Sequence, residues 1–241
     1  MARVAANQAK SVEARKLYVY RQEELVALHK GNGKLACQEK REYAVTPGPD
    51  GIVKRETKSE VKGDGTCSVT FESDSKRYES EGIASGHSAD GIPRDLFPLT
   101  AGEQRLYSYK IEGTEKYHDR NAYRVSFQPN HQRDKDGDEG YWKGETLIDA
   151  EEFQPVLVTT DLTAKIPLAV RILLGTNVHG VGFTVSYRRM PDGIWFPASF
   201  GGEFEVRALF LMKRSIAINV TNSDFRRADV ASSVAFDTVK Q

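Results

Sequence analysis

The sequence predicts a mainly β protein of the α+β class, with antiparallel strands and one helix at the N-terminus. Apolar and charged residues alternate through most of the chain, which is typical of strands that expose one face to water. Turn signals rich in glycine separate these runs at short intervals. The first residues lack the alternation and consist of good helix formers without glycine or proline.

Composition narrows the possible partners. The 241 residues are 39% hydrophobic, which is enough for a substantial core, and 34 basic residues balance 34 acidic ones. This balance argues against nucleic acid as a partner and against a general attraction to anionic membranes. The longest apolar runs fall short of the roughly 18 residues of a membrane-spanning helix, and residues 1–10 lack the apolar segment of a signal peptide.

The first third of the chain is predicted to be a helix followed by strands. Residues 1–16 form the helix, and residues 17–72 form a strand meander that turns at 31–33, 47–51 and 63–65. The residues expected on one face of the helix are Val4, Ala5, Gln8, Val12 and Leu17.

Strands resume after an irregular region. Residues 73–102 show no sustained period and are predicted to be a loop, and residues 103–236 form the main strand region. Turns are expected near 118–121 and 149–154, and Asp192-Gly193 is a strong hairpin signal. The prediction is about eleven or twelve strands in a single domain that covers residues 1–241.

One apolar segment interrupts the strands. Residues 165–175, "KIPLAVRILLG", carry Arg171 as the only charge after Lys165, with Pro167 and Gly175 suited to the two ends of a helix. A short helix is therefore predicted near 166–174. It is either a buried core element or a lid over an apolar cavity, and the sequence leaves both open.

The acidic stretch 132–145, "QRDKDGDEGYWKGE", resembles a calcium loop in its alternating aspartates. A helix–loop–helix calcium site needs flanking helices and a glycine at the sixth loop position. Strand patterns flank this stretch instead, and Glu139 occupies that position. The stretch is therefore predicted to be a polar hairpin connection, and no metal site is expected.

No catalytic residue is predicted. The five histidines are scattered, and the sequence lacks the usual serine-nucleophile and nucleotide-binding motifs. Asp149, Glu151 and Glu152 cluster in one turn, a pattern typical of a solvated loop. The two cysteines, Cys37 and Cys67, fit either two free thiols or one disulfide.

Particular motifs resemble a known family. Residues 109–129 ("YKIEGTEKYHDRNAYRVSFQP"), 142–160 ("WKGETLIDAEEFQPVLVTT") and 182–204 ("GFTVSYRRMPDGIWFPASFGGEF") resemble lipoprotein-sorting-like envelope proteins, the group of the periplasmic carrier LolA and the outer-membrane receptor LolB. Residues 166–187 and 222–236 are similar to predicted secreted proteins of soil acidobacteria. The resemblance covers roughly residues 96–236.

This resemblance implies a fold and a function. The fold is a strongly curved antiparallel sheet forming an incomplete barrel, with the N-terminal helix and the short apolar helix packed on its concave face. The implied protein is periplasmic or secreted, although the sequence leaves a cytoplasmic location open. It is non-enzymatic, needs no cofactor, and binds a hydrophobic small molecule, lipid or lipoprotein acyl chain. The ligand-binding candidates are Phe127, Val158, Ile166, Leu168, Ile172, Leu173, Phe183, Val185, Trp195 and Phe210.

Two alternatives remain. From periodicity alone, the apolar residues of the later strands fit a packed core as well as a cavity. The first alternative is therefore a structural or protein-interaction module with a self-filled cavity and an envelope protein as partner. The second, less favoured, is a hydrolase that uses the acidic turns.

Overall fold

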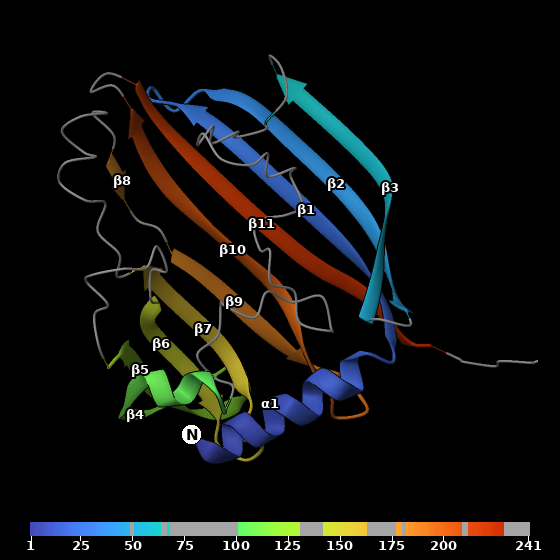
Figure 1. Cartoon of the computed structure of the whole chain (residues 1–241), viewed down its shortest axis with the longest axis vertical. Coiled ribbons are helices and arrows are strands. Elements are labelled where there is room, and N and C mark those ends of the chain that lie inside the picture. The colour runs from blue at the N-terminus through green and yellow to red at the C-terminus, as the bar shows by residue number, and fades with distance from the viewer. Residues whose placement is uncertain are drawn as a thin grey trace, which may run out of the picture.

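The structure is a computed structural model and consists of a curved antiparallel sheet with one α-helix across its end (Figure 1). The described residues are 1–48, 51–63, 67, 101–130, 142–162, 177–179, 182–208 and 212–228. Four sequence predictions lie wholly or mostly outside them: the helix near 166–174, most of the acidic stretch 132–145, the irregular region 73–102 up to residue 100, and the last strand of the meander at 66–72 apart from Cys67.

The described elements follow the predicted order. The helix is α1, Ala2–Arg15, and a short 3-10 turn spans Glu103–Leu106. The strands are β1 Tyr18–Lys30, β2 Leu35–Gly48, β3 Gly51–Gly63, β4 Tyr107–Tyr117, β5 Arg120–Pro129, β6 Trp142–Asp149, β7 Pro155–Leu162, β8 Asn177–His179, β9 Gly182–Arg189, β10 Trp195–Ala208 and β11 Met212–Arg227.

The strands form one sheet in the order β3-β2-β1-β11-β10-β9-β7-β6-β5-β4, and β8 pairs with β10 off this path. Every pairing is antiparallel. In the described part of the chain the outer strands, β3 and β4, end the order at opposite sides, so the sheet is open (Figure 1). The predicted mainly β fold with an incomplete barrel is confirmed.

The predicted hairpin at Asp192-Gly193 is also confirmed. Gly193 has a φ of +88°, a left-handed conformation that side chains other than glycine rarely adopt. Asp192 Oδ1 accepts a hydrogen bond from the main-chain N–H of Ile194, 3.3 Å away. This local chemistry explains why β9 and β10 pair as neighbours.

A pair of glycines in β10 allows close approach between strands. A Cβ atom on Gly202 would lie 2.0 Å from the carbonyl oxygen of Gly182 in β9, and one on Gly201 would lie 2.4 Å from that of Ile218 in β11. The backbones of β9 and β11 therefore lie closer to these two glycines than a residue with a side chain would permit. Glycine inside a strand is typical of such close approach and of sharp bends in curved sheets.

Replacing Gly202 by alanine should therefore destabilise the protein by about 2 kcal/mol, because a backbone atom must move to make room for the new methyl group. Urea denaturation would measure the change in the free energy of unfolding. The control is Gly113→Ala in β4, since a Cβ there meets nothing within 4 Å. Equal stability of the two variants would contradict the close-packing explanation.

Two clusters of buried side chains form the described core. The larger draws on α1, β5, β6, β7, β9 and the start of β10; its fully buried centre includes Val158 and Val185. The smaller lies where β1, β2 and β11 approach the β9–β10 hairpin, and Phe196 is its central ring, 4.9 Å from Tyr18 and 4.7 Å from Phe225 between ring centroids. Together they fix α1 and the hairpin against the sheet.

The buried face of α1 differs in part from the prediction. Leu17, expected on this face, is 43% exposed, and Val12 is only half-buried. Ser11 and Arg15 are buried in their place, because Arg15 donates to the main-chain carbonyl of Trp195 and a side chain of the β6–β7 turn donates to Ser11. The buried residues of α1 are Val4, Ala5, Gln8, Ser11 and Arg15.

Candidate ligand-binding face

One row of residues crosses the whole sheet on a single face. The strand registers join neighbours in the row pair by pair, so the row runs without a break from β3 to β4. From β11 onward it is apolar except for one buried threonine. The row comprises Ser59, Arg41, Glu24, Val220, Phe200, Val185, Val158, Thr146, Val125 and Ile111. We call the face that carries this row the apolar face.

The apolar face continues in the rows on one side of this row, whereas the next row on the other side holds the hydrogen-bonded pair Gln22 and Asn222. Ile216, Ile218 and Val220 of β11 are 4–6% exposed, and Val26 and Leu28 of β1 lie opposite the first two and are half-buried. Neither of the two core clusters of described residues includes these five side chains. They extend the apolar surface beyond the core that α1 contacts.

The opposite face of the same strands is more polar, although it also carries Ala217 and Leu25. Between Ile216 and Val220, the alternate positions hold Ala217 and Asn219, and β1 contributes Glu23 and Leu25. On this face Glu23 forms an ion pair with Lys40 of β2 at 2.8 Å. The sheet is thus amphipathic across its thickness, and its apolar side is the one suited to a hydrophobic ligand.

The structure brings together five of the ten predicted ligand-binding residues. Phe127, Val158, Phe183, Val185 and Trp195 all belong to the larger core cluster, where Val4 of α1 packs with them. The remaining five lie outside the described residues: Ile166, Leu168, Ile172, Leu173 and Phe210. A role in ligand binding remains a prediction for all ten.

Sequence reasoning missed the β11 part of this face. Its signal was present in "SIAINVTN", where Ile216, Ile218 and Val220 alternate with small or polar residues. Period two shows that these three share a face of β11. It does not show that the face is the one shared with Val185 and Val158, because that depends on register between strands distant in sequence.

The apolar face ends in a group of charged side chains on β1, β2 and β3. Lys54 contacts the carboxylate of Glu24, and its Nζ lies 4.0 Å from the ring centroid of Tyr43. Arg41 Nε donates to Glu39 Oε1 at 2.7 Å. Burial raises the pKa of the Tyr43 hydroxyl, against an opposing hydrogen bond from Arg41. We call Glu24, Glu39, Arg41 and Lys54 the charged end.

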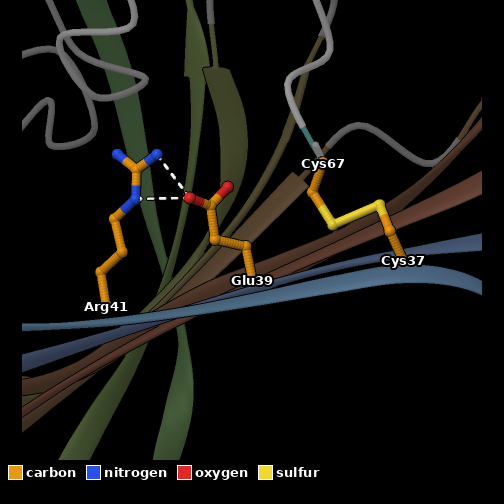
Figure 2. Close-up of a disulfide and its surroundings, with 4 residues drawn as sticks. All are labelled: Cys37, Glu39, Arg41 and Cys67. Atoms are coloured by element: carbon orange, nitrogen blue, oxygen red, sulfur yellow. Dashed lines mark hydrogen bonds and ion pairs between the residues drawn. A yellow bond between two sulfur atoms is a disulfide. The ribbon is translucent and has the colours of Figure 1, made fainter. Parts of the chain in front are cut away.

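A disulfide joins Cys37 of β2 to Cys67, so of the two states that the sequence left open the structure has the disulfide. Figure 2 shows Cys37, Glu39 and Arg41 rising from the same side of β2, with Cys67 above. Both cysteines are buried, at 3% and 4% exposed. The bond therefore fixes Cys67 on the apolar face, near the charged end.

The acidic turn between β6 and β7 is not a solvated loop, which corrects the sequence interpretation. Asp149 is 1% exposed, receives two hydrogen bonds from Arg120, and accepts the main-chain N–H groups of Glu151 and Glu152 at 3.0 and 2.7 Å. Glu152 in turn binds Arg120, Arg189 at 2.7 Å and the indole N–H of Trp195 at 2.7 Å. Only Glu151 is solvated, at 83% side-chain exposure.

This network anchors α1, and the carboxylates of Asp149 and Glu152 in it are both held by hydrogen bonds. Asn7 donates to the carbonyl of Glu152 at 2.7 Å, and Gln8 to the side chain of Gln154 at 2.5 Å. Burial alone would raise the pKa of Asp149, but hydrogen bonds from Arg120 and the backbone outweigh it and hold the pKa below its ordinary value. A carboxylate so stabilised in its charged form is a poor general acid.

Metal-binding clusters and membrane-spanning helices are both absent from the described residues. These residues contain no group of three or more histidine, cysteine, aspartate or glutamate side chains placed to hold a metal ion. Within the same ranges, no helix has the length and apolar character needed to cross a membrane.

No family model matches the sequence, and a search of curated proteins finds no significant relative. Solved structures do match. An outer membrane lipoprotein-sorting protein domain from Vibrio parahaemolyticus matches at 12% identity and a TM-score of 0.39, over 93% of this chain and 92% of that one. A LolA superfamily protein from Nitrosomonas europaea matches at 12% and 0.36, over 95% and 94%.

A third match is a DUF1329 family protein from Desulfovibrio piger, at 14% identity and a TM-score of 0.37, over 95% of each chain. At such identities and TM-scores the likeness concerns the course of the strands alone. It carries no ligand or partner over to this chain.

Proposed function

We propose that the protein is a non-enzymatic binder of an elongated hydrophobic ligand, such as a lipid or an acyl chain of a lipoprotein. The ligand lies on the apolar face, across the strands. The observation that supports this most directly is the apolar row that runs from Val220 through Val185 and Val158 to Val125. An open sheet cannot close such a face with its own strands, so other parts of the protein or a ligand must shield it from water.

The dimensions of the row suit a single acyl chain. Five steps between neighbouring strands separate β11 from β5, which amounts to roughly 24 Å at the usual strand spacing. One leaflet of a bilayer has a hydrocarbon depth of about 15 Å. Burying about fifteen methylene groups would contribute roughly 12 kcal/mol, and association costs of at least about 4 kcal/mol would leave dissociation constants near the micromolar range within reach.

The proposed location is an oxidising compartment, periplasmic or extracellular. The Cys37–Cys67 disulfide supports this location, because structural disulfides persist in secreted and periplasmic proteins and are rare in a reducing cytoplasm. A hydrophobic ligand that must cross an aqueous envelope would also need a protein that shields it.

A substitution on the apolar face should weaken binding. Leu28→Gln places an amide on this face at a half-buried position. We expect the affinity for palmitate, measured by isothermal titration calorimetry, to fall about five- to tenfold, because one apolar contact is lost. Native mass spectrometry of the gently purified protein would show in parallel whether a lipid co-purifies.

The matched control is Leu25→Gln, on the same strand but facing the opposite way, against Lys40 and Asn219. Both leucines are half-buried, so the two variants should lose similar stability. Only Leu28→Gln should lose affinity for palmitate. Equal affinity of the two variants, or a protein that takes up neither palmitate nor a lysolipid, would rule out the apolar face as the ligand site.

A second candidate function is a structural or protein-interaction module. It is supported by the packing of Phe127, Val158 and Val185 with Val4 of α1, which fills that part of the apolar face with the protein's own side chains. This alternative expects no co-purifying lipid and no change in affinity for small hydrophobic molecules on substitution of Leu28. Its partner would instead be an envelope protein recovered by cross-linking.

A further inference from the structure

We infer that the charged end is the headgroup site of the ligand, and that it selects a zwitterionic head over an anionic one. This inference rests on the proposed function. It assigns an orientation and a chemical class: a single-chain amphiphile with its tail across β11 to β5 and its net-neutral polar head over β1 and β2.

The first step is the position of the charges. Glu24 pairs in register with Arg41 on one side and with Val220 on the other. In the next row Val26 pairs with Glu39 and with Ile218. The change from apolar to charged thus occurs abruptly between β11 and β2, along the line on which the ligand would lie. An amphiphile has the same abrupt change where its tail meets its head.

The second step is the partial burial of these charges. The side chains of Glu39 and Glu24 are 16% and 22% exposed, and those of Lys54 and Arg41 are 30% and 34% exposed. Ion pairs removed from water in this way contribute little to stability, because desolvation offsets their attraction. Their placement on the apolar face therefore calls for another explanation, and recognition of a polar group provides one.

The third step is the sign of the charges. Glu24 and Glu39 carry two negative charges and Arg41 and Lys54 carry two positive ones. The exposed Glu56, which pairs in register with Tyr43 on the same face, adds a further negative charge beside them. A phosphate next to Arg41 or Lys54 would be attracted, but an anionic head without a positive group would also face both carboxylates. A head with phosphate and ammonium groups can pair with both signs at once.

The experiment compares three probes on the whole protein: lysophosphatidylethanolamine, lysophosphatidylglycerol and palmitate. We expect the first to bind at least about fivefold more tightly than the second, a preference that weakens as salt rises. Glu24→Gln should reduce or abolish this preference, since it removes one of the carboxylates that would face an anionic head. Glu39→Gln should act in the same direction and serves as a second variant if the first does not fold.

The matched control is Glu23→Gln. It removes the same charge from the neighbouring position, but on the opposite face of β1, where Glu23 pairs with Lys40. The control should keep the preference of the native protein. Equal binding of both lysolipids to the native protein, or equal effects of Glu23→Gln and Glu24→Gln, would overturn the headgroup assignment while leaving the proposed function intact. Failure of all three probes to bind would overturn both.

Discussion

Replacing Asp149 by asparagine is expected to lower the free energy of unfolding by about 3 kcal/mol. Asp149 is almost fully buried and holds the β6–β7 turn through its bonds to Arg120 and two backbone N–H groups. Asparagine keeps the shape but loses the charge, and Arg120 then keeps only the glutamates of the turn. Urea denaturation monitored by tryptophan fluorescence would measure the loss.

Asp149 should also make the free energy of unfolding depend on pH. The pKa of Asp149 is lower in the folded protein than its ordinary value of 3.8. Its stabilising contribution is therefore fully present above that value and is lost as pH falls through the depressed folded pKa. The native protein should lose stability steeply below about pH 4, and Asp149→Asn should lose less over the same interval.

The control for both measurements is Glu151→Gln. Glu151 lies in the same turn and approaches Arg120 at 3.5 Å, but its side chain is 83% exposed. Its substitution should change stability by less than about 0.5 kcal/mol, as is usual for surface ion pairs. If Glu151→Gln and Asp149→Asn cost the same, the buried network would not be what holds the turn.

Removing the disulfide should lower the free energy of unfolding by an amount comparable to that expected for Asp149→Asn. The bond closes a loop between residues 30 apart in sequence, and the chain-entropy model gives roughly 3–4 kcal/mol for a loop of this size. The double variant Cys37→Ala, Cys67→Ala should therefore unfold at a lower urea concentration than the oxidised protein. Because the disulfide fixes Cys67 on the apolar face, the affinity of the double variant for palmitate is also expected to change.

Reduction of the native protein provides an independent test. A thiol reductant should shift its unfolding midpoint toward that of the double variant, and should leave the double variant unchanged. Thiol titration under denaturing, non-reducing conditions should find no free thiol in the native protein. Two titratable thiols, together with an unfolding midpoint that reductant does not alter, would show that the cysteines are unpaired in solution.

Much of the fold could be predicted from sequence because its determinants are local. The alternation in residues 17–48 predicts two strands, and β1 and β2 occupy Tyr18–Lys30 and Leu35–Gly48. Turn chemistry at Asp192-Gly193 and near 149–154 placed two hairpins correctly. The N-terminal helix followed from its helix-forming residues. Each of these signals lies within a few residues of the element that it specifies.

The candidate site was only partly predictable. Period two shows that Val156 and Val158 share a face of one strand, and that Ile216 and Ile218 share a face of another. Whether two strands turn their apolar sides the same way depends on register, which long-range pairing fixes. The sequence therefore predicted five ligand-binding candidates that the structure places in one core cluster. It missed the side chains of β11 and β1 that extend the apolar face.

The sequence by itself determined the strands, the turns, the N-terminal helix and the balance of charge. Tertiary structure alone decided three further features: the pairing of Cys37 with Cys67, the burial of Asp149, and the row from Arg41 to Ile111. The physical reason is common to all three. Each depends on residues that are distant in the chain and meet only when strands pair in a particular register, so no local pattern can specify them.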